Sequence, residues 1–358
     1  MPSSTPSPRA DAAARPAAVL CGLGGALPAR VVTNAELAGR LDTSDAWITS
    51  RTGIRQRHVA TAGTATSDLA VEAGARALKS SGSAEADAVV LATTTPDRPC
   101  PATAPEVAAR LGLTGVAAFD VGGVCTGFLY ALASGVGLVC AGLAERVLVV
   151  GADTFSTILN PADRSTAVVF GDGAGGVVLR AGHPDEPGAL GAFDLGSDGG
   201  SAELIQVAAG GSRQRTSGRR PAPEDFFFSM DGRAVFRQAV ERMAGSVRTV
   251  LDRTGWRTDE VDHVVSHQAN QRILDALARE LGIGPERCVS NIARVGNTAA
   301  ASIPLALVDA VADGSLRPDQ RVLLTAFGGG LTWGATALVW PELPALPDTS
   351  IQAREART

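Results

Sequence analysis

The stretch AAFDVGGVCTGF, residues 117–128, predicts the central turn of the fold. It begins as a short buried strand, passes through Gly122 and Gly123, and continues into an apolar helix. Cys125 falls in the first turn of that helix, where unpaired backbone N–H groups and the positive end of the helix dipole favour a thiolate. Because the thiolate is the nucleophilic form of cysteine, the sequence predicts a reactive residue here. An unreactive core position is the alternative, since free cysteines are often buried.

Short segments on either side of this turn recur later in the chain. DAVV at 87–90 returns as DHVV at 262–265, and RVLV at 146–149 returns as RVLL at 321–324, each 175 residues further on. The equal offset indicates two duplicated halves. Strands that alternate with helices predict an α/β fold with buried sheets.

The length of 358 residues suits two domains of ordinary size. We predict an N-terminal half over residues 18–185 and a C-terminal half over residues 186–340. Residues 1–17 are mostly Pro, Ser, Ala and Arg without a continuous apolar run, which predicts a disordered arm rather than a signal peptide. The segment 341–358 is predicted to be a flexible tail.

Composition excludes several functional classes. A net charge of −5 provides no basic surface for nucleic acid, so no nucleic-acid partner is expected. Four His without clustering and no C-x-x-C pair predict no metal site. The five scattered cysteines suit a reducing, cytoplasmic location; they are Cys21, Cys100, Cys125, Cys140 and Cys288.

Two further patterns have an ordinary structural interpretation. Residues 121–144 carry no charge and are long enough to span a membrane. Their six glycines and the strands predicted on both sides favour a buried core helix, so no membrane association is expected. The run GDGAGG at 171–176 has the form G-x-G-x-x-G, but a strand follows it where a dinucleotide site needs a helix.

Several motifs along the chain form one pattern with Cys125. They are DTSDAWITSRTGIR at 42–55, SHQAN at 266–270, VGNTAA at 295–300 and FGGGLTWG at 327–334. In this order, from about residue 18 to 340, they resemble the ketoacyl-acyl-carrier-protein synthase III family of the thiolase superfamily. The resemblance implies the five-layered αβαβα thiolase fold, built from two similar halves whose central helices pack together.

The resemblance also implies catalytic roles. Cys125 would be the nucleophile that carries an acyl group, and His267 and Asn297 would donate hydrogen bonds to the enolate formed when malonate loses carbon dioxide. The backbone N–H groups of Cys125 and Gly329 would form the oxyanion hole. Phe327 matches an aromatic residue beside the cysteine, with ordinary packing as the alternative.

Binding roles follow from the same resemblance. Trp47 and Arg51 match the pair that holds the CoA adenine, Arg164 matches a second contact to adenine or phosphate, and Asn270 matches a contact to pantetheine. Without the resemblance, Trp47 would be assigned to the core and Arg51 to the surface. Arg272 matches a residue proposed to receive the acidic helix of acyl carrier protein.

Two segments depart from the acetyl-selective members of the family. Cys100 lies about where those relatives carry a bulky aromatic that limits the acyl pocket of the partner subunit, so a wider pocket is expected. Four arginines at 212–220 form either a solvated loop or a docking patch for an acidic carrier protein or CoA phosphates.

We therefore predict a homodimeric, cytoplasmic synthase that takes an acyl-CoA and malonyl-acyl carrier protein as substrates and needs no resident cofactor. An acyltransferase of the same fold, without decarboxylation, is the nearest alternative. A type III polyketide synthase shares the Cys, His and Asn, but the glycines at 328–330 argue against it. A non-catalytic scaffold that binds acyl-CoA or carrier protein is the alternative from another class.

Overall fold

The computed structural model describes residues 16–344, so most of the predicted arm and the tail from 345 onward lie outside the described residues. The predicted arm, residues 1–17, extends one residue too far, because Ala17 already begins the first strand. At the other end, Pro341 is buried and Leu343 packs against the main core, although both were assigned to the flexible tail.

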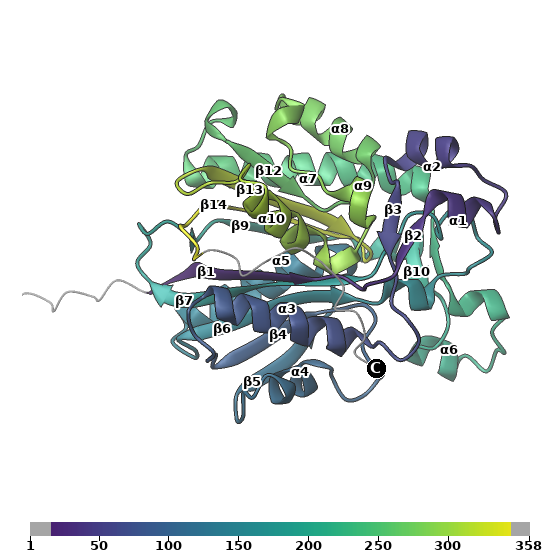
Figure 1. The fold of residues 1–358 in the computed structure, drawn as a ribbon, viewed down its shortest axis with the longest axis horizontal. Coiled ribbons are helices and arrows are strands. Elements are labelled where there is room, and N and C mark those ends of the chain that lie inside the picture. The colour runs from purple at the N-terminus through teal and green to yellow at the C-terminus, as the bar shows by residue number, and fades with distance from the viewer. Residues whose placement is uncertain (1–15, 345–358) are drawn as a thin grey trace, which may run out of the picture.

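Two sheets form the framework (Figure 1). In the first, the neighbours β5, β4 and β6 run parallel, and β7, β1 and β8 complete the sheet in antiparallel pairs. Its strands, in spatial order, are β5 (Ala117–Val121), β4 (Ala88–Ala92), β6 (Arg146–Asp153), β7 (Gly173–Gly182), β1 (Ala17–Ala26) and β8 (Ala189–Leu190).

The second sheet contains one parallel pair, β12 with β13, followed by antiparallel β14 and β9. Its strands are β12 (His263–Ser266), β13 (Arg321–Gly328), β14 (Thr332–Val339) and β9 (Phe193–Ser197). Two short ribbons lie outside the sheets: β2 (Val31–Thr33) with β3 (Gln56–His58), and β10 (Ile205–Val207) with β11 (Phe228–Met230).

Helices make the remaining three layers. The helices α5 (Gly127–Cys140) and α10 (Ser302–Ala312) lie between the sheets, and each contacts strands of both. The outer face of the first sheet carries α3 (Thr66–Ser80) and α4 (Ala104–Arg110), and that of the second carries α7 (Gly232–Thr254) with α8 (Gln271–Leu281). The shorter helices are α1 (Asn34–Ala38), α2 (Asp45–Thr52), α6 (Ser212–Thr216) and α9 (Ile292–Val295).

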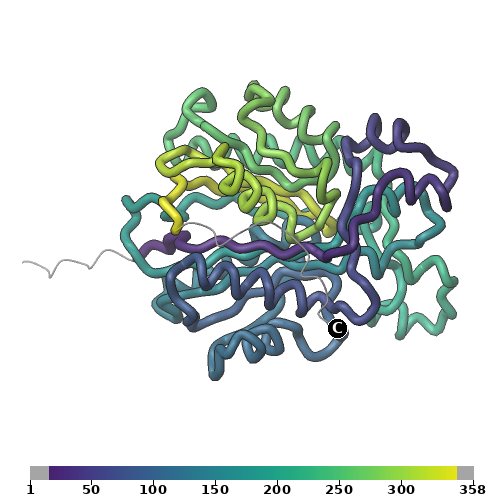
Figure 2. Tube along the Cα trace, viewed as in Figure 1, coloured from purple at the N-terminus to yellow at the C-terminus, as the bar shows by residue number. Residues whose placement is uncertain are grey.

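This arrangement confirms the predicted αβαβα fold. Figure 2 shows most of the blue part of the chain below the first strand and most of the green to yellow part above it. The uncharged segment 121–144 contains α5, whose Phe128, Leu129 and Leu132 belong to the main hydrophobic core. No helix within residues 16–344 is long and apolar enough to cross a membrane. The glycine run 171–176 leads into β7 rather than into a helix.

The predicted duplication is visible in the elements themselves. β4 and β12 begin 175 residues apart, at 88 and 263, and so do α5 and α10, at 127 and 302. A 3-10 turn precedes each central helix, at Val124–Thr126 and at Ala299–Ala301. Val124 and Ala299, the first residues of these turns, share the same left-handed φ of 47°. The repeat therefore preserves even an unfavourable backbone angle.

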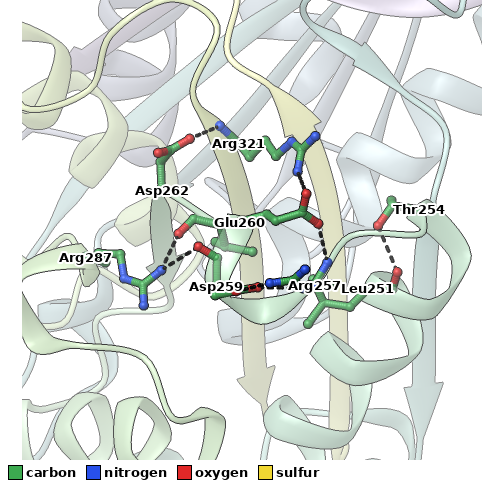
Figure 3. A network of polar contacts seen from close by, with 9 residues as sticks. Leu251, Thr254, Arg257, Asp259, Glu260, Asp262, Arg287 and Arg321 are labelled. Carbon is green, nitrogen blue, oxygen red and sulfur yellow. Dashed lines mark hydrogen bonds and ion pairs between the residues drawn. The ribbon is translucent and has the colours of Figure 1, made fainter.

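The recurring sequence segments have a physical explanation. The carboxylate of Asp262 accepts a hydrogen bond of 2.7 Å from the backbone N–H of Arg321 at the start of β13, as Figure 3 shows. In the first half, Asp87 accepts the equivalent bond of 2.8 Å from Arg146. Each acid, which directly precedes its own strand, therefore ties the start of that strand to the start of the neighbouring parallel strand.

One buried carboxylate joins the two halves. Asp153, at the end of β6, is fully buried, and its Oδ1 accepts hydrogen bonds from the backbone N–H groups of Thr94 at 2.7 Å and Thr95 at 3.2 Å. Its Oδ2 accepts one of 3.1 Å from the N–H of Ala300, in the turn before α10. Close approach of that turn requires Gly151, since a Cβ there would lie 2.3 Å from the carbonyl oxygen of Ala300.

We expect Asp153→Asn to lower the free energy of unfolding by about 1–3 kcal/mol, because the amide would leave at least one buried backbone N–H without an acceptor. Urea unfolding followed by circular dichroism measures this loss. Asp252→Asn, on an exposed position of α7, is the matched control and should change stability by less than about 0.5 kcal/mol. Equal stabilities of the two variants would contradict the role given to Asp153.

Candidate active site

Cys125 lies in the 3-10 turn between β5 and α5, as the sequence predicted in outline. The end of β13 packs directly on this turn. A Cβ on Gly328 would lie 2.8 Å from the backbone nitrogen of Cys125 and 2.9 Å from that of Thr126. Only glycine therefore lets the second half approach the turn so closely.

One cavity, open to solvent, brings Cys125, His267 and Asn297 together. Asn270 and Phe327 line it as well. The structure thus gathers five residues that the sequence analysis singled out, from segments more than 200 residues apart.

His267 follows the end of β12 and is 2% exposed. Its Nδ1 lies 2.6 Å from the hydroxyl oxygen of Ser302. Burial lowers the pKa of His267 to about 3, so the ring is neutral at physiological pH. A neutral imidazole carries one N–H and one acceptor nitrogen.

The side-chain amide of Asn297 has a defined orientation. Its Oδ1 accepts a hydrogen bond of 2.9 Å from the backbone N–H of Ala299. The backbone of Asn297 is held as well, because its N–H donates to Val169 at 3.0 Å and its carbonyl accepts from Gly171 at 2.9 Å. Since the oxygen is engaged, the N–H₂ group is the part of this amide available to the cavity.

The predicted low pKa of Cys125 is wrong for this structure. Burial raises the pKa of the thiol, and the nearby negative charge of Asp153 raises it further. Cys125 also lies in a 3-10 turn, two residues before α5 begins, rather than in the first turn of that helix as expected. The raised pKa favours the neutral thiol of Cys125 at physiological pH.

The glycine loop after β13 packs against the turn that carries Cys125. Gly329 is buried, and a Cβ there would lie 3.1 Å from a methyl carbon of Val124. The Thr332 hydroxyl lies 3.0 Å from the carbonyl of Gly329 and 3.3 Å from that of Gly123. These contacts place the two predicted oxyanion-hole segments against each other.

The three residues predicted to hold the CoA adenine also gather. The guanidinium carbon of Arg164 lies 5.2 Å from the ring centroid of Trp47, and that of Arg51 lies 6.0 Å from it. Arg164 donates a hydrogen bond of 2.6 Å to the carbonyl of Asp42. A half-buried indole with two exposed guanidinium groups is a suitable surface for a nucleotide.

Other predicted residues lie apart from the cavity. Cys100 is exposed and does not line the cavity within the described part of this chain, so its role as a pocket residue of a partner subunit stays a prediction. Arg272 is exposed at the start of α8, next to the cavity-lining Ile273. In the arginine-rich segment 212–220, residues 212–216 form the short exposed helix α6.

Sequence reasoning missed the apolar wall of the cavity. Val235, Ala239 and Met243 line it from α7, and their spacing of four residues marks one buried face of that helix. This periodicity is visible in the sequence, but it equally describes an ordinary core helix. Ile205, Phe228 and Met230 contribute from β10 and β11.

Comparison with known proteins agrees with this geometry. A family model for 3-oxoacyl-[acyl-carrier-protein] synthase III matches residues 119–199, and the model of its C-terminal part matches residues 251–340. Beta-ketoacyl-[acyl-carrier-protein] synthase III 3 of Streptomyces coelicolor is 64% identical over 327 residues, which cover 91% of this chain and 98% of that protein. The synthase III of Pseudomonas aeruginosa PAO1 is 57% identical over the same length, covering 91% and 98%.

Solved structures give the same result. The crystal structure of 3-oxoacyl-(acyl carrier protein) synthase III from P. aeruginosa PAO1 is 56% identical, with a TM-score of 0.86 over 92% of this chain and 99% of that one. The priming β-ketosynthase of the R1128 polyketide pathway is 32% identical, also with a TM-score of 0.86, over 94% and 100%. Fold and site define a condensing enzyme of the thiolase superfamily. The chain belongs to the 3-oxoacyl-[acyl-carrier-protein] synthase III family.

Because the thiol of Cys125 is neutral at rest, its alkylation by iodoacetamide should accelerate about tenfold per pH unit up to about pH 9. Peptide mass analysis of samples quenched at each pH measures this rate, with the exposed Cys100 as a reference thiol in the same digest. A plateau in the rate at Cys125 near neutral pH would reveal a preformed thiolate and contradict the raised pKa.

Proposed function

We propose that this protein starts acyl chains by accepting an acyl group from acyl-CoA on Cys125. It then condenses that group with malonyl-acyl carrier protein, with loss of carbon dioxide, to give a 3-ketoacyl-carrier protein. The observation that carries the proposal is the meeting of Cys125, neutral His267 and the oriented amide of Asn297 on one cavity. The names of the related synthases support the same reaction.

In the first half-reaction the sulfur of Cys125 attacks the thioester carbon of acyl-CoA. The thiol loses its proton as the bond forms, and the departing CoA thiolate takes up a proton. The backbone N–H groups of Cys125 and Gly329 are the proposed donors to the tetrahedral oxyanion. Deprotonation coupled to attack suits the neutral resting thiol.

In the second half-reaction the carboxylate of the malonyl group leaves as carbon dioxide. Its electron pair forms an enolate whose oxygen accepts hydrogen bonds from His267 and Asn297. The enolate carbon then attacks the acyl carbonyl, and the thiolate of Cys125 departs and takes up a proton from water to regenerate the neutral thiol. Two uncharged donors suit this step, because the charge that they stabilise exists only after carbon dioxide is lost.

Substrate binding is assigned to the surface around the cavity. Trp47, Arg51 and Arg164 are proposed to hold the adenine and phosphates of CoA, and Asn270 the pantetheine arm. Arg272 is proposed to contact the acidic carrier protein, with the arginines of 212–220 as a further candidate surface. CoA acts as a substrate, and the reaction needs no resident cofactor.

We also propose that the protein is a homodimer. The strand β5 forms an edge of the first sheet, and the side chain of Phe119 on it is 37% exposed. An edge strand with an exposed aromatic side chain favours pairing with another chain. A partner subunit would also be needed for Cys100 to line the acyl pocket, which its small side chain is predicted to leave wider.

Asn297→Ala tests the condensation step. The variant should retain acylation of Cys125 yet lose about 10²–10³ in the rate of ketoacyl formation, as expected for one lost oxyanion donor. Intact mass of the acyl-enzyme and release of labelled carbon dioxide from malonyl-carrier protein are measured in the same samples. Wild-type protein that acylates Cys125 but never releases carbon dioxide, and acylates a hydroxyl or amine instead, would establish the acyltransferase alternative. Absence of any acyl-enzyme would establish the scaffold.

Trp47→Ala tests the proposed CoA site. Loss of one stacking contact, about 1–3 kcal/mol, should raise the apparent KM for acyl-CoA about tenfold or more. Trp256→Ala is the matched control, because this indole also packs against an arginine: the guanidinium carbon of Arg321 lies 5.2 Å from its ring centroid. Arg321 begins β13, whereas the other end of that strand lines the cavity. An unchanged KM in Trp47→Ala would limit Trp47 to a packing role.

A further inference from the structure

The imidazole of His267 has a buried hydroxyl partner that the reaction described above does not use. Ser302, the first residue of α10, is 1% exposed, and its Oγ lies 2.6 Å from Nδ1 of His267. The same oxygen accepts a hydrogen bond of 3.3 Å from the backbone N–H of Gln268. Ser302 therefore contacts both the ring and the backbone that carries it.

The hydrogen bonds of Ser302 favour one tautomer of the His267 ring. If Nδ1 carried the proton, the Ser302 oxygen would accept from both His267 and Gln268, and its own buried O–H would lack a partner among the described residues. If Ser302 donates to Nδ1, the hydroxyl, the ring nitrogen and the Gln268 N–H are all satisfied. The second arrangement leaves the ring proton on Nε2.

The first half of the chain has a contact at the positions that correspond to His267 and Ser302. At the shared offset of 175 residues, Ala92 and Gly127 of the first half correspond to His267 and Ser302 of the second. A Cβ on Gly127 would lie 3.2 Å from the Cβ of Ala92, so this packing contact recurs in both halves. In the second half two polar side chains occupy it, which makes the His267–Ser302 pair a feature of the site rather than of the fold.

We propose that Ser302 is a positioning residue: it donates a hydrogen bond to Nδ1 of His267 and so keeps the ring proton on Nε2. The consequence for condensation rests on the proposed function, since Nε2–H would be the donor to the enolate. The assignment of the tautomer does not depend on that function. The neutrality of the buried ring supports it, because a neutral ring must choose one nitrogen.

Nitrogen-15 NMR of the full-length protein tests the tautomer directly. The chain contains four histidines, so protein labelled with ¹⁵N-histidine gives a tractable spectrum, and His267→Gln identifies the signals of His267. At pH 7 the wild type should show a protonated Nε2 and an unprotonated Nδ1. A protonated Nδ1 in the wild type would overturn the proposal.

Two substitutions of Ser302 test its role. Ser302→Ala should abolish the single tautomer and lower the kcat for carbon dioxide release about tenfold or more, within the about 10²–10³-fold expected for complete loss of a donor. Acylation of Cys125 should stay within about twofold. Ser302→Thr keeps a hydroxyl and should restore the tautomer and most of the rate. Ser315→Ala, an exposed serine just after α10, is the matched control and should behave as wild type.

The outcomes separate this proposal from the proposed function. Retention of the wild-type tautomer in a folded Ser302→Ala, as judged by its melting temperature, would overturn the role of Ser302. If Ser302→Ala does not fold, the wild-type and Ser302→Thr spectra decide, and a wild-type tautomer other than Nε2–H overturns it. A wild type with the expected tautomer but no carbon dioxide release would instead remove the condensation function and leave the positioning role standing.

Discussion

The buried carboxylate of Asp153 is the constraint on which the geometry of the site depends. It holds the loop after β4 through Thr94 and Thr95 and the turn before α10 through Ala300, so one side chain joins elements of both halves. Burial raises the pKa of Asp153 to about 6, which shows that desolvation opposes its charge. Its hydrogen bonds favour the charged form, and its position near Cys125 helps keep the thiol neutral.

The duplicated halves contribute unequally to the chemistry. Cys125 of the first half corresponds to Ala300 of the second, and His267 of the second corresponds to Ala92 of the first. The framework of strands, turns and central helices is thus common to both halves, whereas the reactive side chains alternate between them. The turn before α5 packs against β13 of the second half, and the turn before α10 packs against β6 of the first half. Because each turn contacts a strand of the other half, polar groups from both halves reach one cavity.

The three polar side chains that meet at the cavity are uncharged at rest. Cys125 is a neutral thiol, His267 is a neutral imidazole, and Asn297 supplies an amide whose oxygen is already bonded to the backbone. Charge therefore appears during the reaction, first on the tetrahedral oxygen and then on the enolate. Donors that are already oriented need no reorganisation when that charge develops, which is the condition for electrostatic stabilisation of a transition state.

The sequence by itself determined the alternation of strands and helices and the 175-residue repeat, because short-range patterns encode them, and its motifs predicted five residues that line the cavity. Asp153 ends an ordinary buried strand and Ser302 opens an ordinary apolar helix, so neither was distinguishable before the chain was folded. Only the tertiary structure decided that Ser302 meets His267, that α7 supplies the cavity wall, and that Cys125 is a neutral thiol. Each of these outcomes depends on which groups come into contact when the chain packs and on how much water is excluded around them. Both are set by residues far apart in the sequence, so short-range patterns do not encode them.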